Sequence, residues 1–372
     1  MKPTIIAYYL PQFHPIKEND EWWGKGFTEW TNVGRAKPLW RGHKQPRVPA
    51  DLGYYDLRIP EVREQQTQLA REAGVTAFCY WHYWFGNGKR LLGDIFDDVL
   101  ASGKPDYPFC LGWANHSWYA KSWDKTSDKD KLLIEQTYPG EDDARMHFDF
   151  LLKAFNDHRY LKIDGKPFLL VYDGAKLPKL YIDNFRKWAK QSGFPDIFVV
   201  TSTTDIFKPH QDFIEMGFDA VTYIRQSTLW TEDYLKMNRI QKYYSRIARI
   251  IKQTITGIPR GARDYAKIYK RLVTTVEYAP EVIPQIVPQW DHSPRSGDKA
   301  NVIFYNSEPK FFAENVKDAL NAIKDKPKDR QIIILKSWNE WGEGNYIEPD
   351  LDHGKGFIEA LRTTLDNFEG AI

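Results

Sequence analysis

Residues 60–81, PEVREQQTQLAREAGVTAFCYW, hold one complete unit of the fold, a helix that leads into a buried strand. Proline is favoured at the first position of a helix, where a backbone N–H would have no partner within the helix, and glycine is favoured just after the last turn. Pro60 and Gly74 therefore predict a helix over 60–73. The run Ala77–Trp81 is short, apolar and rich in aromatic residues, as strands buried on both faces are. The same alternation recurs on both sides of this unit.

Eight such strands are predicted in the chain, and most are followed by a helical pattern. The strands are Thr4–Leu10, Ala77–Trp81, Phe109–Trp113, Phe168–Tyr172, Ile197–Thr201, Ala220–Ile224, Val282–Val287 and Gln331–Lys336. The helices fall near 60–73, 89–102, 141–157, 178–192, 208–216, 231–272, 308–324 and 355–369. This alternation favours an α/β fold, a closed (β/α)₈ barrel of the TIM type.

The organisation expected from this pattern is a single catalytic barrel domain over residues 1–372, enlarged by loop insertions at about 11–59, 114–140 and 225–280. A doubly wound fold of two domains is the alternative. It would usually show a linker or a change of composition near the middle of the chain, and the sequence has neither.

The composition is that of a globular protein, with 42% hydrophobic and 27% charged residues and a net charge of +2. It excludes collagen-like, coiled-coil and disordered chains, and it gives no overall attraction to nucleic acid. No apolar run reaches the length of a membrane span, and the N-terminus does not resemble a signal peptide. Only Cys79 and Cys110 are present, which indicates a reducing compartment; we expect a cytoplasmic protein with two buried thiols.

Tryptophan is concentrated where the predicted strands end. Of the 14 Trp, only Trp188 lies in a predicted helix, and the other 13 lie in strand ends and the loops beyond them. Indole rings beside Asn, His, Asp and Glu suit a sugar, because the rings stack on its C–H faces while polar groups bind its hydroxyls. The alternative is that the rings only fill the upper barrel. The candidate substrate-binding residues are Tyr8, Tyr9, Gln12, His14, Trp22, Trp23, Glu29, Trp30, Tyr80, Trp81, His82, Trp113, Asn115, His116, Trp118, Tyr172, Tyr223, Trp290, Asp291, Trp338, Asn339, Trp341 and Glu348.

The candidate catalytic residues are Glu340 and Glu343, two carboxylates three residues apart at the end of the eighth strand. Glycosidic cleavage needs such a pair, with one carboxyl protonated and one ionised. A crowded apolar environment would raise one pKa and separate the two roles. Two solvated loop glutamates are the other interpretation, which the flanking Trp338 and Trp341 disfavour.

The segments Trp338–Glu343 and Ile347-Glu348-Pro349 resemble the signature of glycoside hydrolase family 99, the endo-α-mannosidases. Tyr8–His14, Trp22–Trp30 and Phe78–Trp84 are similar to the related WbsX-like branch, and the branch resemblance runs from about residue 3 to about 370. That branch is associated with bacterial surface-polysaccharide and O-antigen loci, and it is often named glycosyltransferase.

The resemblance implies a (β/α)₈ barrel and retaining cleavage without a metal or other cofactor. The substrate's own 2-hydroxyl would attack and give a 1,2-anhydro sugar, with Glu340 as the base on that hydroxyl and Glu343 as the acid/base at the leaving oxygen. Gly342 stands where the mannosidases carry His, and this difference leaves the donor sugar open. The same barrel could serve as a transferase in lipopolysaccharide or O-antigen synthesis, or as a glycan-binding module that has lost catalysis.

Other signals are weaker. Asp128-Lys-Asp130 and Asp350-Leu-Asp352 match the Asp-x-Asp pattern of metal-dependent sugar-nucleotide transferases, a pattern that is common by chance. The nine His lack zinc-site spacing, and no glycine-rich phosphate loop is present.

Residues 236–271 depart from the neutral balance, with eleven basic residues against Asp264 alone. The segment has a net charge of +10 and the whole chain has +2, so the remainder of the chain has a net charge of −8. Its apolar residues recur at helical spacing, which predicts a basic amphipathic helix. It could be a barrel helix with a solvated basic face, or it could rest on an anionic membrane that presents a lipid-linked oligo- or polysaccharide.

Overall fold

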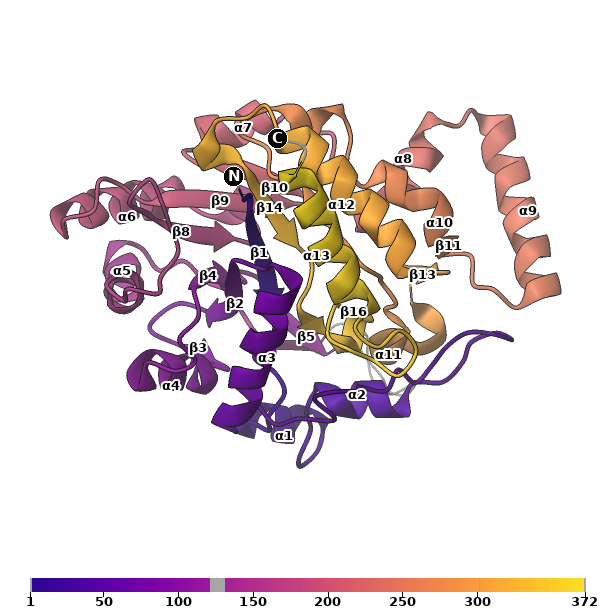
Figure 1. The fold of residues 1–372 in the computed structure, drawn as a ribbon, viewed down its shortest axis with the longest axis horizontal. Helices are drawn as coiled ribbons and strands as arrows, with labels where there is room; N and C mark the ends of the chain where they lie inside the picture. Colours follow the sequence, from indigo (N-terminus) through magenta and orange to yellow (C-terminus); the bar gives the residue numbers. More distant parts are fainter. Residues whose placement is uncertain (1, 121–130, 301, 371–372) are drawn as a thin grey trace.

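The computed structural model describes residues 2–120, 131–300 and 302–370, and its centre is a barrel of eight parallel strands (Figure 1). In chain order the barrel strands are β1 (Thr4–Tyr9), β2 (Ala77–Trp84), β4 (Phe109–Trp113), β8 (Lys166–Val171), β9 (Phe198–Thr203), β10 (Ala220–Tyr223), β12 (Gln285–Ile286) and β14 (Ile332–Leu335). Each strand lies next to its predecessor in the barrel, as right-handed β–α–β connections produce.

The barrel closes on itself. β1 pairs with β2 on one side and with the last strand, β14, on the other. Between β10 and β12 the contact is short: Val221 bridges Val282, and the Ile283 N–H donates to the Val221 carbonyl at 2.8 Å. The predicted (β/α)₈ barrel is confirmed.

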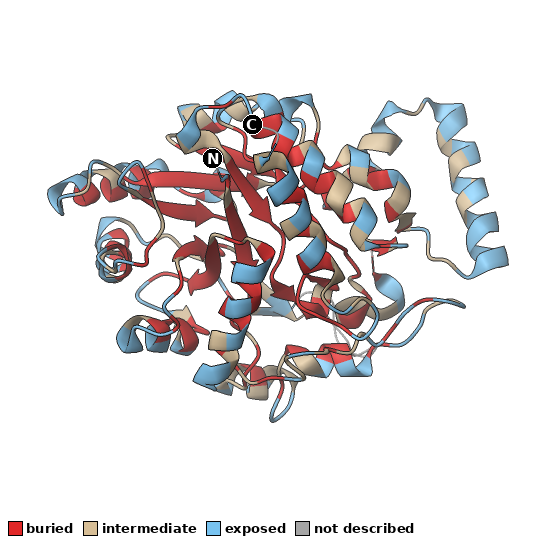
Figure 2. Cartoon of the chain, in the orientation of Figure 1, coloured by how far each residue is buried: buried red, intermediate tan, exposed pale blue. Residues whose placement is uncertain are grey.

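Seven helices that follow the strands cover the barrel: α3 (Pro60–Ala73), α4 (Asp94–Ser102), α5 (Glu141–Phe155), α6 (Lys179–Gln191), α7 (His210–Glu215), α12 (Pro309–Ile323) and α13 (Gly356–Glu369). The barrel strands are almost wholly buried, whereas these helices alternate buried and exposed residues (Figure 2). The expected signals delimit α3, since Pro60 is its first residue and Gly74 ends it with a φ of 83°.

Smaller elements decorate the barrel. The chain between β1 and α3 contains α1 (Lys17–Trp23) and α2 (Glu29–Arg35), and the chain after β4 contains the hairpin of β5 (Trp118–Ala120) and β6 (Lys131–Ile134). The remaining strands and helices are β3 (Arg90–Leu91), β7 (Lys162–Ile163), α8 (Leu229–Lys236), α9 (Arg239–Thr256), β11 (Ala262–Asp264), α10 (Tyr265–Ile268), α11 (Ser293–Ser296), β13 (Ile303–Tyr305), β15 (Asn339–Glu340) and β16 (Asn345–Tyr346). Trp22, Trp23 and Trp30 therefore lie in short helices, not in open loops.

The single helix predicted over 231–272 is wrong. The structure has α8, α9 and α10 in its place, with β11 between the last two. Asn238 starts a new helix, because its side chain accepts the Gln241 N–H at 2.9 Å and the Gln241 side chain accepts the Asn238 N–H at 3.0 Å. Gly257, with a φ of 71°, ends that helix, and Pro259 follows.

Two boundaries also differ from prediction. The helix predicted over 89–102 begins only at Asp94, because Arg90 and Leu91 form β3 and pair with β2. The predicted strand Val282–Val287 is reduced to β12 and the bridge at Val282, since Pro284 between them has no N–H for a ladder hydrogen bond.

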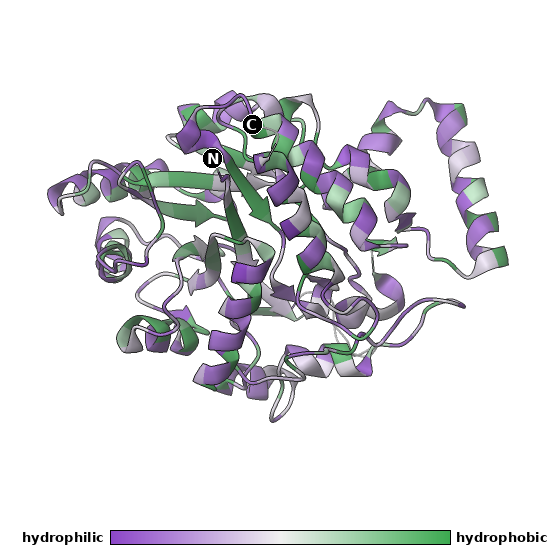
Figure 3. Ribbon diagram, in the orientation of Figure 1, coloured by the Kyte–Doolittle hydropathy of each residue, from purple (hydrophilic) through white to green (hydrophobic). Residues whose placement is uncertain are grey.

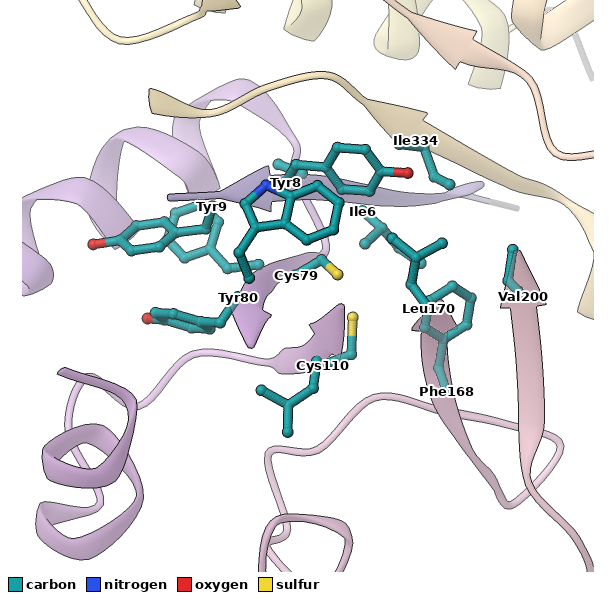
Figure 4. Packing of buried hydrophobic residues seen from close by; sticks show 14 of the residues in the cluster. Ile6, Tyr8, Tyr9, Cys79, Tyr80, Cys110, Phe168, Leu170, Val200 and Ile334 are labelled. Atoms are coloured by element: carbon teal, nitrogen blue, oxygen red, sulfur yellow. The ribbon is translucent and has the colours of Figure 1, made fainter. Parts of the chain in front are cut away.

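The barrel interior is a continuous apolar core. Ile6, Cys79, Cys110 and Leu170 come from four different strands and meet in it (Figure 4). Both thiols are free and fully buried, as expected. Because this packing fixes the strands, it also fixes the rim from which their C-terminal ends and loops project.

Candidate active site

A cavity of about 550 Å³ opens where the barrel strands end. Its wall includes side chains from the ends of β2 and β15 and from the loops after β1, β4, β8 and β12. This is the C-terminal rim of the barrel, where enzymes of this fold carry their chemistry.

Both candidate catalytic carboxyls and eight of the predicted substrate-binding residues lie in the cavity wall. They are Glu340 and Glu343, with Gln12, Trp23, Glu29, Trp81, His116, Trp118, Tyr172 and Trp290. Five of these predicted residues are Trp or Tyr, so the wall joins carboxylates to aromatic rings, the combination that a sugar ring requires.

The other predicted residues lie behind the wall or away from it: Tyr8, Tyr9, His14, Trp22, Trp30, Tyr80, His82, Trp113, Asn115, Tyr223, Asp291, Trp338, Asn339, Trp341 and Glu348. Most of them support the wall. Tyr8 packs against Trp81 with ring centroids 4.7 Å apart, and Trp22 lies 6.0 Å from Trp118.

Several of these residues face the helices or the barrel core. The ring centroids of Tyr9 and Tyr80 are 4.5 Å apart, and those of Trp338 and Phe78 are 5.1 Å apart. Trp113 donates to the Trp84 carbonyl, His82 pairs with His147 at 2.9 Å, and Tyr223 donates to the Lys208 carbonyl. His14 lies in the loop after β1 and is buried, with 1% of its surface exposed.

Two asparagines tie the loops of the rim together. Asn339 accepts the Leu10 N–H at 2.7 Å and donates to the Leu10 carbonyl at 3.1 Å, which joins the end of β1 to β15. Asn115 accepts the Asp173 N–H at 2.7 Å and donates to the Asp173 carbonyl at 2.9 Å. In this structure both amides hold backbone in place and do not face the cavity.

Glu340 lies at the end of β15, in the floor of the cavity. Its carboxylate is almost fully buried and accepts a hydrogen bond from the Ser337 hydroxyl at 2.9 Å. Burial and the negative charge of Glu343 raise the pKa of Glu340 to about 7, although Lys336 and Arg295 oppose the shift. Glu340 can therefore gain or lose a proton near neutral pH.

Glu343 is in a different environment, because Arg295 holds it. The Arg295 guanidinium donates to Glu343 at 2.6 Å and to Glu29 at 3.2 Å. Arg295 was not among the predicted residues, since it lies in α11, beyond the seventh strand, and nothing near it in the sequence indicates two carboxylate partners. The cavity thus contains two glutamates in different surroundings, one buried and one bound by a guanidinium.

Gly342, between the two glutamates, leaves the space that this ion pair occupies. A Cβ at position 342 would lie 1.9 Å from Glu29 Oε2 and 2.9 Å from Arg295 Nε. Any side chain there would displace the Glu29–Arg295 pair.

The wall behind the carboxyls is held by Glu348. Its carboxylate accepts hydrogen bonds from Trp341 at 2.7 Å, Gln66 at 2.7 Å and Tyr55 at 2.9 Å. Trp341 in turn stacks on Tyr346 with centroids 3.6 Å apart and packs against Trp30. The Ile347–Pro349 motif therefore fixes the Trp341 ring from behind.

Asp291 has a similar supporting position. It accepts hydrogen bonds from His43 and from the Gln45 amide, both at 2.7 Å, and from the Ser293 N–H at 2.9 Å. These bonds join the loop after β1 to the start of α11, the helix that carries Arg295.

Further wall residues were missed by the sequence-based selection, among them Asn19, Tyr83, Asp173, Lys176 and Lys336. Tyr83 and Asp173 belong to the strand-end segments that drew attention to Trp81 and Tyr172. Lys336 is one residue beyond β14, and its ammonium lies 4.9 Å from the Trp290 ring centroid. A lysine inside a predicted strand gives no sequence signal of that contact.

The two Asp-x-Asp segments fall outside this cavity or outside the described residues. Asp128 and Asp130 are in the part of the chain that the structure does not describe. Asp350 accepts a hydrogen bond from the Tyr346 hydroxyl at 2.6 Å, and Asp352 pairs with Arg47 at 2.7 Å. Over residues 2–120, 131–300 and 302–370 no group of three or more His, Cys, Asp or Glu is arranged to hold a metal ion.

Comparison with known proteins identifies relatives over almost the whole chain. The model of the family described as Glycosyltransferase WbsX matches residues 5–361. The chain is 33% identical, over 97% of its length, to the uncharacterized protein WxcX of Xanthomonas campestris pv. campestris strain B100. It spans about half of that relative, 49% of its length.

Two solved structures have the same fold at low sequence identity. A glycoside hydrolase-like protein superposes with a TM-score of 0.59 at 16% identity, covering 98% of this chain and 94% of its own. The GH99 endo-alpha-mannosidase from Bacteroides thetaiotaomicron gives 0.53 at 16% identity, covering 99% and 98%. At these identities the likeness concerns the barrel fold.

Proposed function

The chain belongs to the WbsX glycosyltransferase family, and from this premise we propose that it is a carbohydrate-active enzyme that cleaves or forms a glycosidic bond through Glu340 and Glu343. The observation that carries the proposal is the pair itself. Both carboxyls face one aromatic-lined cavity at the barrel rim, one of them buried with a pKa raised to about 7 and the other bound by Arg295. Glycosidic chemistry needs two carboxyls in different protonation states.

In the proposed reaction Glu340 is the base. Its ionised carboxylate takes the proton of the sugar's 2-hydroxyl, and that oxygen attacks the anomeric carbon as the bond to the leaving oxygen breaks. Glu343 gives its proton to the leaving oxygen, so a 1,2-anhydro sugar forms with no net change in protons. A carboxyl of pKa about 7 is a stronger base than an ordinary glutamate and is still substantially ionised at neutral pH.

Arg295 works against the role of Glu343 as an acid, but its second carboxylate partner reduces that opposition. A general acid must carry a proton, and the guanidinium opposes protonation of the carboxylate that it contacts. Because Arg295 also contacts Glu29, it keeps a carboxylate partner when Glu343 becomes neutral. Glu29 thus has a supporting role in the proposal, and the aromatic rings bind the sugar.

Water or a sugar hydroxyl could open the anhydro intermediate, which gives a retaining family 99-like hydrolase in the first case and a transferase or transglycosidase in the second. We propose hydrolysis as the primary activity, with endo action on an α-mannoside-like glycan. A glycan of a bacterial surface polysaccharide, lipopolysaccharide or O-antigen is the proposed substrate class. Family membership and the cavity support the carbohydrate class.

Product analysis decides between these outcomes. Candidate glycans are incubated with the protein in ¹⁸O-labelled water, with and without an acceptor oligosaccharide. Hydrolysis predicts one ¹⁸O at the new reducing end with retained configuration, whereas transfer predicts a longer unlabelled glycan. A non-catalytic glycan-binding barrel predicts no product and the same affinity in Glu340→Gln.

We further propose that the protein works at the cytoplasmic face of a membrane on a lipid-linked glycan, with α9 as the contact. Within the described residues no helix is long and apolar enough to cross a bilayer. However, α9 stands away from the barrel and presents both hydrophobic and hydrophilic residues (Figure 3), and none of its residues is buried.

The two faces of α9 differ in what they contact. Ile240, Tyr243, Tyr244, Ile251 and Ile255 are 51–78% exposed. On the other side Lys242 lies over the Tyr234 ring and Lys252 over the Tyr305 ring. The apolar face therefore points away from the protein, and α9 has five basic residues and no acidic one. An anionic bilayer complements such a helix, whereas a second copy of it would bring like charges together.

A further inference from the structure

A second cavity, of about 600 Å³, adjoins the first one at the base of α9. It lies between α9, the segment that leads into β11, and the segment before β13. Ser227 lines both cavities, so a ligand in the carboxyl-lined site could extend into this one.

The second cavity is strongly basic. Arg249, Arg260, Arg263 and Lys299 line it, and Asp298 is the one acidic residue among the described lining residues. Asp233 pairs with Arg263 at 3.2 Å, but it also pairs with Arg271 at 2.8 Å, so its charge is shared. Burial and the positive charges of Arg260 and Arg263 lower the pKa of Arg249, which reflects the mutual repulsion of these guanidinium groups.

A buried donor also lines this cavity. Gln226, in the turn Arg225–Ser227 after β10, is 2% exposed, and its Nε2 has no hydrogen-bond partner among the described residues. Its neighbour Arg225 faces elsewhere and pairs with the buried Glu277 at 2.7 Å. A buried amide donor without an acceptor is unfavourable, and an anionic ligand oxygen would supply the acceptor.

We infer that this cavity binds a diphosphate group, the anionic part of a sugar donor or of a glycan carrier whose sugar reaches Glu340 and Glu343. A diphosphate carries several negative charges, as a site with four cations requires, and guanidinium groups bind phosphate oxygens through paired N–H donors. The role in the reaction rests on the proposed function, whereas the binding itself does not.

The test is calorimetric titration of the full chain with inorganic pyrophosphate, in the absence of vesicles and glycan. We expect binding that weakens at high salt. The variant Arg260→Gln/Lys299→Gln changes two exposed residues, so it should fold normally and bind about tenfold or more weakly. The matched control Arg239→Gln/Arg246→Gln removes the same charge from parts of α9 outside the cavity and should bind as the wild type does.

Two further ligands distinguish the source of the diphosphate. Tighter binding of farnesyl diphosphate than of pyrophosphate assigns a lipid carrier, and tighter binding of a nucleoside diphosphate assigns a nucleotide sugar; either result supports the site. The proposal is overturned if the wild type does not bind pyrophosphate, or if the cavity variant binds it as tightly as the wild type does. It is also overturned if a uronic acid binds as tightly as pyrophosphate. If Glu340→Gln were fully active, the proposed function would fail while the binding result would stand.

Discussion

The different environments of Glu340 and Glu343 lead to a specific pH dependence. As the proposed base, Glu340 must be ionised, and its pKa is raised to about 7, so its active form increases as the pH rises through 7. On an aryl glycoside with a very acidic leaving group, which needs no proton from Glu343, we expect kcat/KM to increase about tenfold per pH unit below that value and then to level off. If this rising limb of the pH profile ended near pH 4.5, the assignment of Glu340 as the base would be contradicted. In Arg295→Gln the limb should move to higher pH, because Arg295 lowers the pKa of Glu340.

The absence of a side chain at Gly342 is a second feature of single-residue scale. Gly342→Ala would place a Cβ 1.9 Å from Glu29 Oε2, so the Glu29–Arg295 pair must separate. We expect a loss of about 1–3 kcal/mol in the free energy of unfolding, measured by urea denaturation, together with reduced activity. Gly34→Ala, where a Cβ meets nothing within 4 Å, is the control. An unaffected Gly342→Ala variant would argue against the clash.

The carboxyl pair could be predicted from the sequence because both residues belong to one short segment at a strand end. The sequence does not separate Tyr8, which packs beside Trp81 at the base of the wall, from Tyr9, which packs toward Tyr80 and Gln66. Neighbours on a strand point to opposite sides, and a strand that is apolar on both sides gives no periodicity to assign them. Arg295 was missed because its partners are 266 and 48 residues away in the chain.

At the scale of elements, α9 is the feature that the barrel does not explain. If its outward face meets a membrane, the purified chain should co-sediment with vesicles that contain phosphatidylglycerol but not with phosphatidylcholine vesicles, and salt should weaken the binding. Replacing Ile240, Ile251 and Ile255 with Ser should abolish binding, and so should replacing Arg239, Lys242 and Arg246 with Gln.

Matched controls use exposed residues on other helices. Met146→Ser with Leu180→Ser removes apolar surface from α5 and α6, and Lys153→Gln with Lys187→Gln and Lys324→Gln removes three positive charges. Both should bind vesicles like the wild type. Absence of vesicle binding by the wild type would contradict the membrane proposal. A dimer in sedimentation analysis that the Ile variant dissociates would instead assign the outward face of α9 to a second copy.

The elements themselves were predictable where local signals were strong. Pro60 and Gly74 delimit α3 as expected. The segment 231–272 was predicted as one helix because its apolar spacing continues through the breaks, and the cap at Asn238 and the stop at Gly257 are single residues within that pattern. Pairing of β11 with β13, which joins residues about forty apart, has no local signal at all.

At the scale of the whole molecule, the barrel brings eight strand ends to one rim, and every proton transfer in the proposed reaction then has a carboxyl partner. We therefore expect the rate to be unchanged by prolonged incubation with EDTA, measured on the glycan identified by product analysis. Loss of activity with EDTA that Mn²⁺ or Mg²⁺ restores would replace the carboxyl mechanism with a metal-dependent transfer.

The measurement that tests the central claim most directly is the turnover of Glu340→Gln and Glu343→Gln on a natural glycan and on an aryl glycoside with a very acidic leaving group. We expect each variant to lose about 10²–10⁴ in rate on the glycan while it stays folded. The aryl glycoside should restore Glu343→Gln but not Glu340→Gln, because only Glu343 assists the leaving oxygen. Glu215→Gln, an exposed glutamate of α7, should behave as the wild type does. A wild-type rate in either active-site variant would contradict the account.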